Sequence, residues 1–139
     1  MGRNPAGTPR VYIFSIDITA AMTQRRNQTL KPRWFQILLS LSDSDRHGSD
    51  IVREVLEQTN GDLRLWPAML YRSLEQMMEV ELIEELRDPD QRPAGASAKR
   101  RYFRITRAGR AVLAAEADRL EHLAGVARAK IVLSKENPA

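Results

Sequence analysis

Four polar side chains in the stretch "PAMLYRSLEQMME" have the chemistry of nucleic-acid contacts: Tyr71, Arg72, Ser73 and Gln76. Arginine bonds guanine through two donors and glutamine pairs with adenine, so Arg72 and Gln76 suit base reading. Tyr71 and Ser73 suit phosphate, which fixes the register of a complex without specifying sequence. The alternative interpretation is an ordinary solvated helix face, and the neighbouring elements have to decide between the two.

Basic residues gather in two zones of the chain. Residues 1–33 hold six basic residues and one acidic, residues 92–110 hold seven basic and none acidic, and the remainder holds nine basic and seventeen acidic. Two basic zones on an otherwise acidic chain favour a surface that faces a polyanion. Solvated charged loops are the alternative. The second zone contains Lys99, Arg100 and Arg101, which join the candidate nucleic-acid contacts.

Length and composition exclude several classes. A chain of 139 residues predicts one domain with an adequate core. The absence of cysteine excludes disulfides and thiolate metal sites. No apolar run approaches the roughly 18 residues that span a bilayer, so we expect a cytoplasmic protein without a membrane partner. No phosphate loop, nucleophile elbow or metalloprotease motif occurs, so we expect no enzyme, no cofactor and no metal.

The apolar spacing predicts three short helices ahead of the second basic zone. "PRWFQILLSLS" is apolar on most sides and is expected at the centre of the core. "HGSDIVREVLEQTNG" carries one stripe, with Ser49 or Asp50 as its cap and Asn60–Gly61 as its stop. Pro67 opens the third helix.

A hairpin and a long helix follow. "ELIEELRD" and "RRYFRIT" predict two strands around the flexible loop "PDQRPAGASAK". In the second strand Phe103 and Ile105 should face one side and Tyr102 the other. Thr106 is the expected cap of a helix that runs to about Leu133.

The last helix carries a heptad seam. Its members recur at spacings of 4, 3, 4, 3 and 4: Leu113, Ala117, Leu120, Ala124, Ala127 and Ile131. Such a seam is typical of helices that pair, and its alanines allow close approach. The sequence therefore predicts a homodimer.

These elements predict a mainly α fold with a small β-hairpin, namely a winged helix-turn-helix domain with a long C-terminal dimerisation helix. We expect an N-terminal extension at 1–29 (disordered or a short arm), the DNA-binding domain at 30–106, the dimerisation helix at 107–133 and a tail at 134–139. In such a domain the helix before the hairpin enters the major groove of double-stranded DNA. The polar side chains of the third helix are then exposed in the free protein because they face DNA in the complex.

The sequence resembles the PadR family of bacterial transcriptional regulators over about residues 35–128. The resemblance rests on these segments: His47–Gly48, Pro67, Leu70–Leu74, Leu82–Glu84, Arg101–Phe103 and Thr106–Gly109. It implies a homodimeric repressor on a palindromic operator, with DNA contacts at Tyr71, Arg72 and the wing. Many members of the family release DNA when a small aromatic molecule binds.

The chain departs from the family pattern at two places. Ala68 and Met69 stand where the family often has a small residue and threonine, which implies a different contact at the helix start or an altered operator preference. Both residues are candidate DNA contacts. Glu81 stands where the family usually has glycine, which implies a less sharp helix end.

Trp34 and Trp66 are expected in the core or at its edge. The alternative is stacking on a small aromatic effector, which the absence of tryptophan from the last helix weakens. Two other functions remain open: a winged-helix module that binds a protein instead of DNA, and a DNA-binding regulator without an effector.

Overall fold

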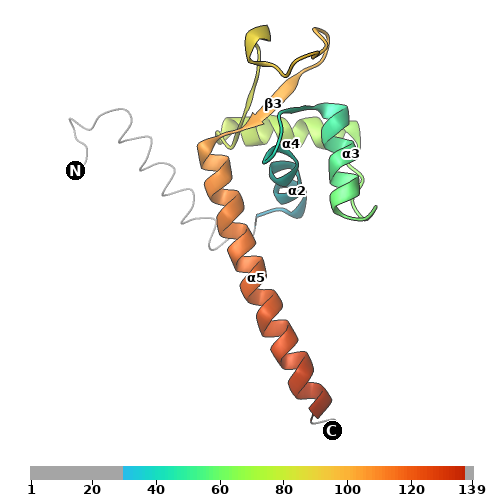
Figure 1. Cartoon of the computed structure of the whole chain (residues 1–139), viewed down its shortest axis with the longest axis vertical. Coiled ribbons are helices and arrows are strands. Elements are labelled where there is room, and N and C mark those ends of the chain that lie inside the picture. Colours follow the sequence, from blue (N-terminus) through green and yellow to red (C-terminus); the bar gives the residue numbers. More distant parts are fainter. Residues whose placement is uncertain (1–29, 137–139) are drawn as a thin grey trace, which may run out of the picture. The chain divides into compact units, whose positions relative to one another are not determined.

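The computed structural model describes residues 30–136, and the expected extension at 1–29 lies outside them. The elements are α2 (Pro32–Leu41), β1 (Arg46–His47), α3 (Gly48–Gln58), α4 (Pro67–Glu79), β2 (Ile83–Glu85), the 3-10 turn η1 (Pro89–Gln91), β3 (Tyr102–Ile105) and α5 (Arg107–Glu136) (Figure 1). This is the mainly helical fold that the sequence predicts.

The sheet has three antiparallel strands in the order β1–β3–β2 among the described residues. Strands β2 and β3 form the predicted hairpin, with Ile83 opposite Ile105 and Glu85 opposite Phe103. Strand β1 pairs Arg46 with the same Phe103. The sequence does not predict β1, because two residues are too short to show an alternating pattern.

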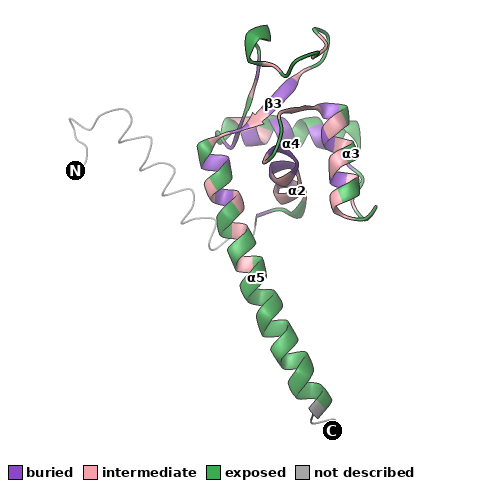
Figure 2. Cartoon of the chain, viewed as in Figure 1, coloured by how far each residue is buried: buried purple, intermediate pink, exposed green. Residues whose placement is uncertain are grey.

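The core lies between the three short helices and the inner face of the sheet (Figure 2). Its largest fully buried side chains come from α2, α3, α4, β2, β3 and the segments next to them: Ile37, Leu38, Leu41, Ile51, Val55, Leu65, Leu70, Leu74, Met77, Ile83, Leu86 and Phe103. Burial of a large apolar side chain contributes roughly 1.5–3 kcal/mol, so these residues hold α4 against the sheet.

Strand β3 is covered on both faces. Phe103 and Ile105 face the core, and Tyr102 on the other face is only 7% exposed. Tyr102 lies under the wing loop, where its hydroxyl accepts a hydrogen bond from the Ser97 N–H at 3.3 Å and the Arg92 guanidinium lies 5.9 Å from its ring. The loop that the sequence predicts to be flexible is therefore held, through Ser97 and Arg92, against the first residue of β3.

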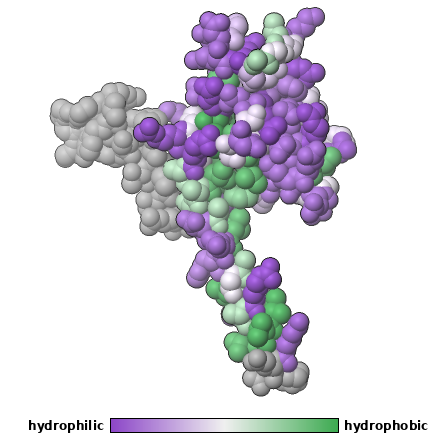
Figure 3. All heavy atoms as spheres, viewed as in Figure 1, coloured by the Kyte–Doolittle hydropathy of each residue, from purple (hydrophilic) through white to green (hydrophobic). Residues whose placement is uncertain are grey.

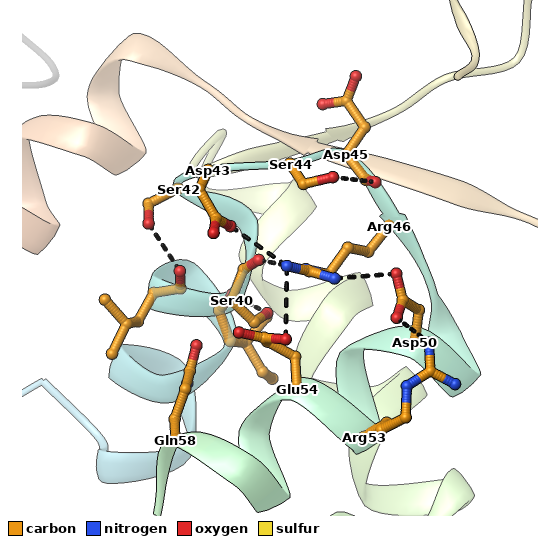
Figure 4. Close-up of polar contacts among 12 residues, drawn as sticks. Ser40, Ser42, Asp43, Ser44, Asp45, Arg46, Asp50, Arg53, Glu54 and Gln58 are labelled. Atoms are coloured by element: carbon orange, nitrogen blue, oxygen red, sulfur yellow. Dashed lines mark hydrogen bonds and ion pairs between the residues drawn. The ribbon is translucent and has the colours of Figure 1, made fainter. Parts of the chain in front are cut away.

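Arg46 joins α2 to α3 (Figure 4). Its guanidinium donates to the Ser40 carbonyl at 2.6 Å and to Asp50 at 3.0 Å, and it also contacts Asp43 and Glu54. The Arg46 side chain is 13% exposed, so these contacts are shielded from water more than a surface ion pair would be. The cluster fixes α3, and α3 in turn packs against α4.

The helix caps differ in one place from the prediction. The cap of α3 is His47 and not Ser49 or Asp50, because the His47 Nδ1 accepts the Asp50 N–H at 3.2 Å. Thr106 acts as expected, since its Oγ1 accepts the Gly109 N–H at 3.0 Å.

Helix α4 ends in a Schellman motif, a C-terminal cap with two backbone hydrogen bonds. The Leu82 N–H donates to the Met77 carbonyl at 2.9 Å and the Glu81 N–H to the Met78 carbonyl at 3.0 Å. This arrangement requires a left-handed residue, and Glu81 has φ +62°. The exit is therefore as sharp as a glycine would make it, at a steric cost to the glutamate.

We expect Glu81→Gly to raise the free energy of unfolding by about 1 kcal/mol, because glycine adopts this conformation without strain. Urea unfolding followed by circular dichroism measures the change. Glu79→Gly, in helical backbone two residues earlier, is the matched control and should lower stability by about 1 kcal/mol. A Glu81→Gly protein no more stable than wild type would contradict the assignment of strain to Glu81.

Helix α5 packs against the domain only through its first turns. Ala108 and Val112 are buried, whereas every residue from Leu120 to Lys135 is exposed (Figure 2). The helix extends to Glu136, three residues past the expected end at Leu133.

Candidate nucleic-acid interface

Helix α4 presents a polar face opposite its buried stripe. Ala68, Met69, Tyr71 and Arg72 are exposed, and Gln76 is half-buried at the edge of this face. The exposed fraction of Tyr71 is 36%, so one side of its ring is packed and the other is open.

Ser73 does not belong to this face. It is 1% exposed, and the prediction that it faces solvent is wrong. Ser73 lies three residues after Leu70 and four before Met77, and both of these are buried, so helical spacing places it in the same stripe.

Tyr71 rests on Gly48 at the start of α3. A β-carbon at Gly48 would overlap the Tyr71 hydroxyl and lie 3.4 Å from Leu70 Cδ2. The absence of a side chain at Gly48 therefore sets the orientation of the Tyr71 ring, a role that the sequence alone does not show.

Arg101 is held by carboxylates instead of being free at the wing. Its guanidinium donates to both Glu85 oxygens, at 2.9 and 3.1 Å, and to Glu75 of α4 at 3.3 Å. It also lies 5.7 Å from the centre of the Tyr71 ring. Arg101 therefore ties the wing strands to α4, and its part in DNA contact stays a prediction.

The same pairing perturbs Glu85. The hydrogen bond from Arg101 lowers the pKa of the Glu85 carboxyl, despite its burial. Glu75 is a carboxylate on the exposed face of α4, and the contact with Arg101 offsets its negative charge there.

The wing tip retains two exposed cations, Lys99 and Arg100. Arg100 Nη1 lies 3.2 Å from His47 Nδ1, which also caps α3. Because Nδ1 faces two donors, the neutral form of His47 with its proton on Nε2 fits the site. The pKa of His47 is lowered by burial and then by the charges of Arg100 and Arg53, against a raising effect of Asp50.

This arrangement predicts acid sensitivity. The folded-state pKa of His47 lies below the ordinary 6.5, so the stabilisation is present above pH 6.5 and is lost as the pH falls from 6.5 through the lower folded-state pKa. We expect the melting temperature of the wild type to fall between pH 7.5 and 5.5 by more than that of His47→Asn, which keeps a cap acceptor without a proton to bind. Thermal unfolding of both proteins at both pH values checks this, and equal shifts would contradict it.

The seam of α5 is mostly uncovered. Leu113 is half-buried, and the other five members are exposed: Ala117, Leu120, Ala124, Ala127 and Ile131. Leu123 and Val126 are further exposed apolar residues that the heptad reading misses, at 47% and 38%. Figure 3 shows hydrophobic side chains gathered along the lower part of α5.

The two tryptophans have different environments. Trp34 is 8% exposed and belongs to the core, as predicted. Trp66 is 61% exposed at the start of α4, so its expected place in or beside the core is wrong. The Arg64 guanidinium lies 5.4 Å from the centre of the Trp66 ring.

Sequence reasoning misses Arg33 as a site residue. Arg33 lies in the first turn of α2, and with Ala68, Met69 and Arg72 it lines an open pocket of about 300 Å³. Its position depends on how α2 packs beside α4, which no local pattern reveals.

Two kinds of feature are missing from the residues that the structure describes. None of their helices is both long enough and apolar enough to cross a bilayer. None of their acidic and histidine side chains gather in a group of three that would hold a metal ion.

Solved structures with similar folds include regulators of transcription. A transcriptional regulator from Clostridium thermocellum is 20% identical, with 69% of this chain and 86% of that chain covered and a TM-score of 0.57. The DNA complex of MepR from S. aureus is 16% identical, with 90% and 95% covered and a TM-score of 0.54. PcaV from Streptomyces coelicolor, in complex with its natural ligand, is 16% identical, with 94% and 85% covered and a TM-score of 0.54.

Sequence comparison gives a more specific result. A protein from Lysinibacillus sphaericus described as uncharacterized protein X is 33% identical over 77 residues, which are 55% of this chain and 67% of that protein. The model of the transcriptional regulator PadR-like family matches residues 37–115, from the middle of α2 into α5. These residues are more than half of the chain and include α4 and the wing. The chain belongs to the PadR-like family of transcriptional regulators, and it is a DNA-binding regulator of the winged-helix type and not an enzyme.

Proposed function

We propose that the protein is a homodimeric repressor that binds a pseudo-palindromic operator. The observation that carries this proposal is the shared position of the open α4 face and the wing, which Arg101 ties together through Glu75 and Glu85. A reader helix and a wing fixed to one another suit a major groove and its flanking backbone.

The side chains on this surface differ in the part of DNA that they suit. Gln76 suits adenine and Arg72 suits guanine or phosphate. Ala68 and Met69 at the helix start supply apolar contacts of the kind that meet a thymine methyl group. Tyr71, oriented by Gly48, has a hydroxyl that can bond phosphate. Lys99 and Arg100 suit the phosphate backbone beside the groove.

The exposed seam of α5 supports pairing of two copies. An isolated helix with a continuous apolar face is poorly stable in water, so a partner that covers Leu120, Ala124 and Ile131 is favoured. Two-fold symmetry of the protein then requires an operator with two-fold symmetry, with half-sites about 10 base pairs apart or a multiple of that distance.

Selection of bound sequences from random duplex DNA tests the whole proposal. We expect an inverted repeat, bound by two protomers, and a reporter gene downstream of it that is less active when the protein is expressed. Recovery of no enriched sequence, or of a site without a repeat that binds one protomer, would refute the dimeric operator complex.

The wing has its own test. Lys99→Ala combined with Arg100→Ala should weaken binding to all duplexes alike and reduce the salt slope of log K by about 2, because each phosphate contact contributes about 0.9. Unchanged affinity in dilute buffer would remove the wing from the interface. Arg101 is left out of this variant because its loss would also release Glu75 and Glu85.

A small aromatic effector is the remaining part of the proposal. Regulators of similar fold include BpsR of Bordetella bronchiseptica, whose DNA binding is regulated by 6-hydroxynicotinic acid. Trp66 is the better candidate for stacking, because its ring is open whereas Trp34 is buried. Arg64 beside it would pair with an acidic group. A thermal-shift screen of planar aromatic acids tests this, and a blank across a broad set would favour a regulator without an effector.

A further inference from the structure

Two arginines and no acidic residue line the pocket beside the start of α4. Its four lining residues are Arg33 of α2 and Ala68, Met69 and Arg72 of α4. None of the four is acidic, and two are arginines. Its volume of about 300 Å³ exceeds what a single phosphate group requires.

Neither arginine is neutralised within the described part of the chain. Arg33 Nε is shielded from solvent and has no hydrogen-bond partner. By contrast, Arg46, Arg101 and Arg104 each form ion pairs with carboxylates. A shielded donor without an acceptor is unfavourable, and two unpaired guanidinium groups raise the local positive potential. The two guanidinium groups together therefore make the pocket a favourable place for an anion.

The backbone adds to this field. Trp66 at the cap position of α4 gives no side-chain hydrogen bond to the helix, and Pro67 has no N–H. The first free N–H groups of α4 therefore belong to Ala68 and Met69, which line the same pocket. The positive end of the helix dipole favours an anion there.

We propose that this pocket holds one phosphate of the DNA backbone and that Arg33 is a DNA contact outside the reader helix and the wing. The inference rests on the proposed function. When the first turn of α4 lies in the major groove, the adjoining helix lies at the groove edge, where the backbone passes. A phosphate there completes the pocket, fixes the register of α4 and adds affinity without sequence preference.

Binding as a function of salt tests the inference. Fluorescence anisotropy would measure the affinity of the full chain for its selected operator and for an unrelated duplex, between 50 and 300 mM salt. Arg33→Ala should weaken both complexes about fivefold at 0.15 M salt and reduce the salt slope by about 0.9. The ratio of the two affinities should not change. Arg33→Lys should keep the slope, because it keeps the charge.

Two further proteins sharpen the result. Lys135→Ala removes an exposed cation from the last turn of α5 and should leave both affinities as in wild type. Arg33→Ala combined with Arg72→Ala should weaken binding by less than the product of the two single effects, because both side chains contact one phosphate.

Different failures are distinguishable. If wild type binds its operator and a folded Arg33→Ala or Arg33→Gln protein binds it equally well with an unchanged slope, the phosphate site is refuted and the repressor stands. A second outcome would also refute the phosphate site. If benzoate raises the melting temperature of the wild type but not that of Arg33→Ala, and both proteins bind DNA equally well, the pocket belongs to a small acid instead. A wild-type protein that binds no duplex refutes the proposed function itself.

Discussion

Gly109→Ala is expected to lower the free energy of unfolding by about 3 kcal/mol, at the upper end of the cost of overpacking. A β-carbon at Gly109 would overlap the Leu82 carbonyl oxygen and lie 2.8 Å from Ile105 Cγ1. The Leu82 carbonyl is backbone and already accepts the Thr106 N–H at 3.0 Å, so it has little freedom to move. The first turn of α5 would have to shift away from the sheet, and urea unfolding would report the loss.

Gly125 in the same helix is the matched control. No atom lies within 4 Å of a β-carbon built there, so Gly125→Ala removes only the flexibility of glycine. It should raise stability by about 1 kcal/mol, because alanine is the better helix former. Opposite signs for the same substitution would show that the contact with Leu82 decides the outcome. If both variants gain stability, the close packing of α5 on the sheet is wrong.

The parts of the fold that follow from sequence are those set by local spacing. The stripe of α4, the stop at Asn60–Gly61 and the Thr106 cap each depend on residues within one or two turns of one another. The hairpin is visible for the same reason, since both its strands flank one loop.

What the sequence does not reveal depends on contacts between distant segments. Arg101 has the residue type of a phosphate contact, but its partners Glu85 and Glu75 lie 16 and 26 residues away along the chain. The role of Gly48 depends on Tyr71 packing across from another helix. Residue type predicts the chemistry available, and tertiary packing decides which of these groups are already satisfied.

The charged side chains around α4 do not all come from α4 itself. The exposed face of α4 carries Glu75 and Glu79 beside Arg72, so the helix alone is not a basic surface. Arg101 offsets one of these carboxylates from the wing, and Arg33 adds a cation from α2. On the proposed interface, the positive potential would therefore come from α4, the wing and α2 together and not from α4 alone.

Leu120→Glu combined with Ile131→Glu is expected to give a folded monomer that binds the operator at least about 100-fold more weakly than wild type. The two side chains are 40% and 55% exposed in the single chain, so the change removes little packing within it. Between paired helices, however, both carboxylates would be buried in the apolar seam. Each protomer would then bind one half-site without the gain of a linked second site, which is worth roughly 100-fold or more.

Ala129→Glu is the control for the added charge. Ala129 lies two residues from Ile131, on the other side of the helix, and it is also exposed. Sedimentation velocity and anisotropy on the same samples should show a dimer with wild-type affinity for Ala129→Glu and a monomer with weak affinity for the double variant. A double variant that stays dimeric would place the pairing surface elsewhere. A double variant that is monomeric yet binds with full affinity would show that one protomer is enough, and the two-fold operator would no longer be required.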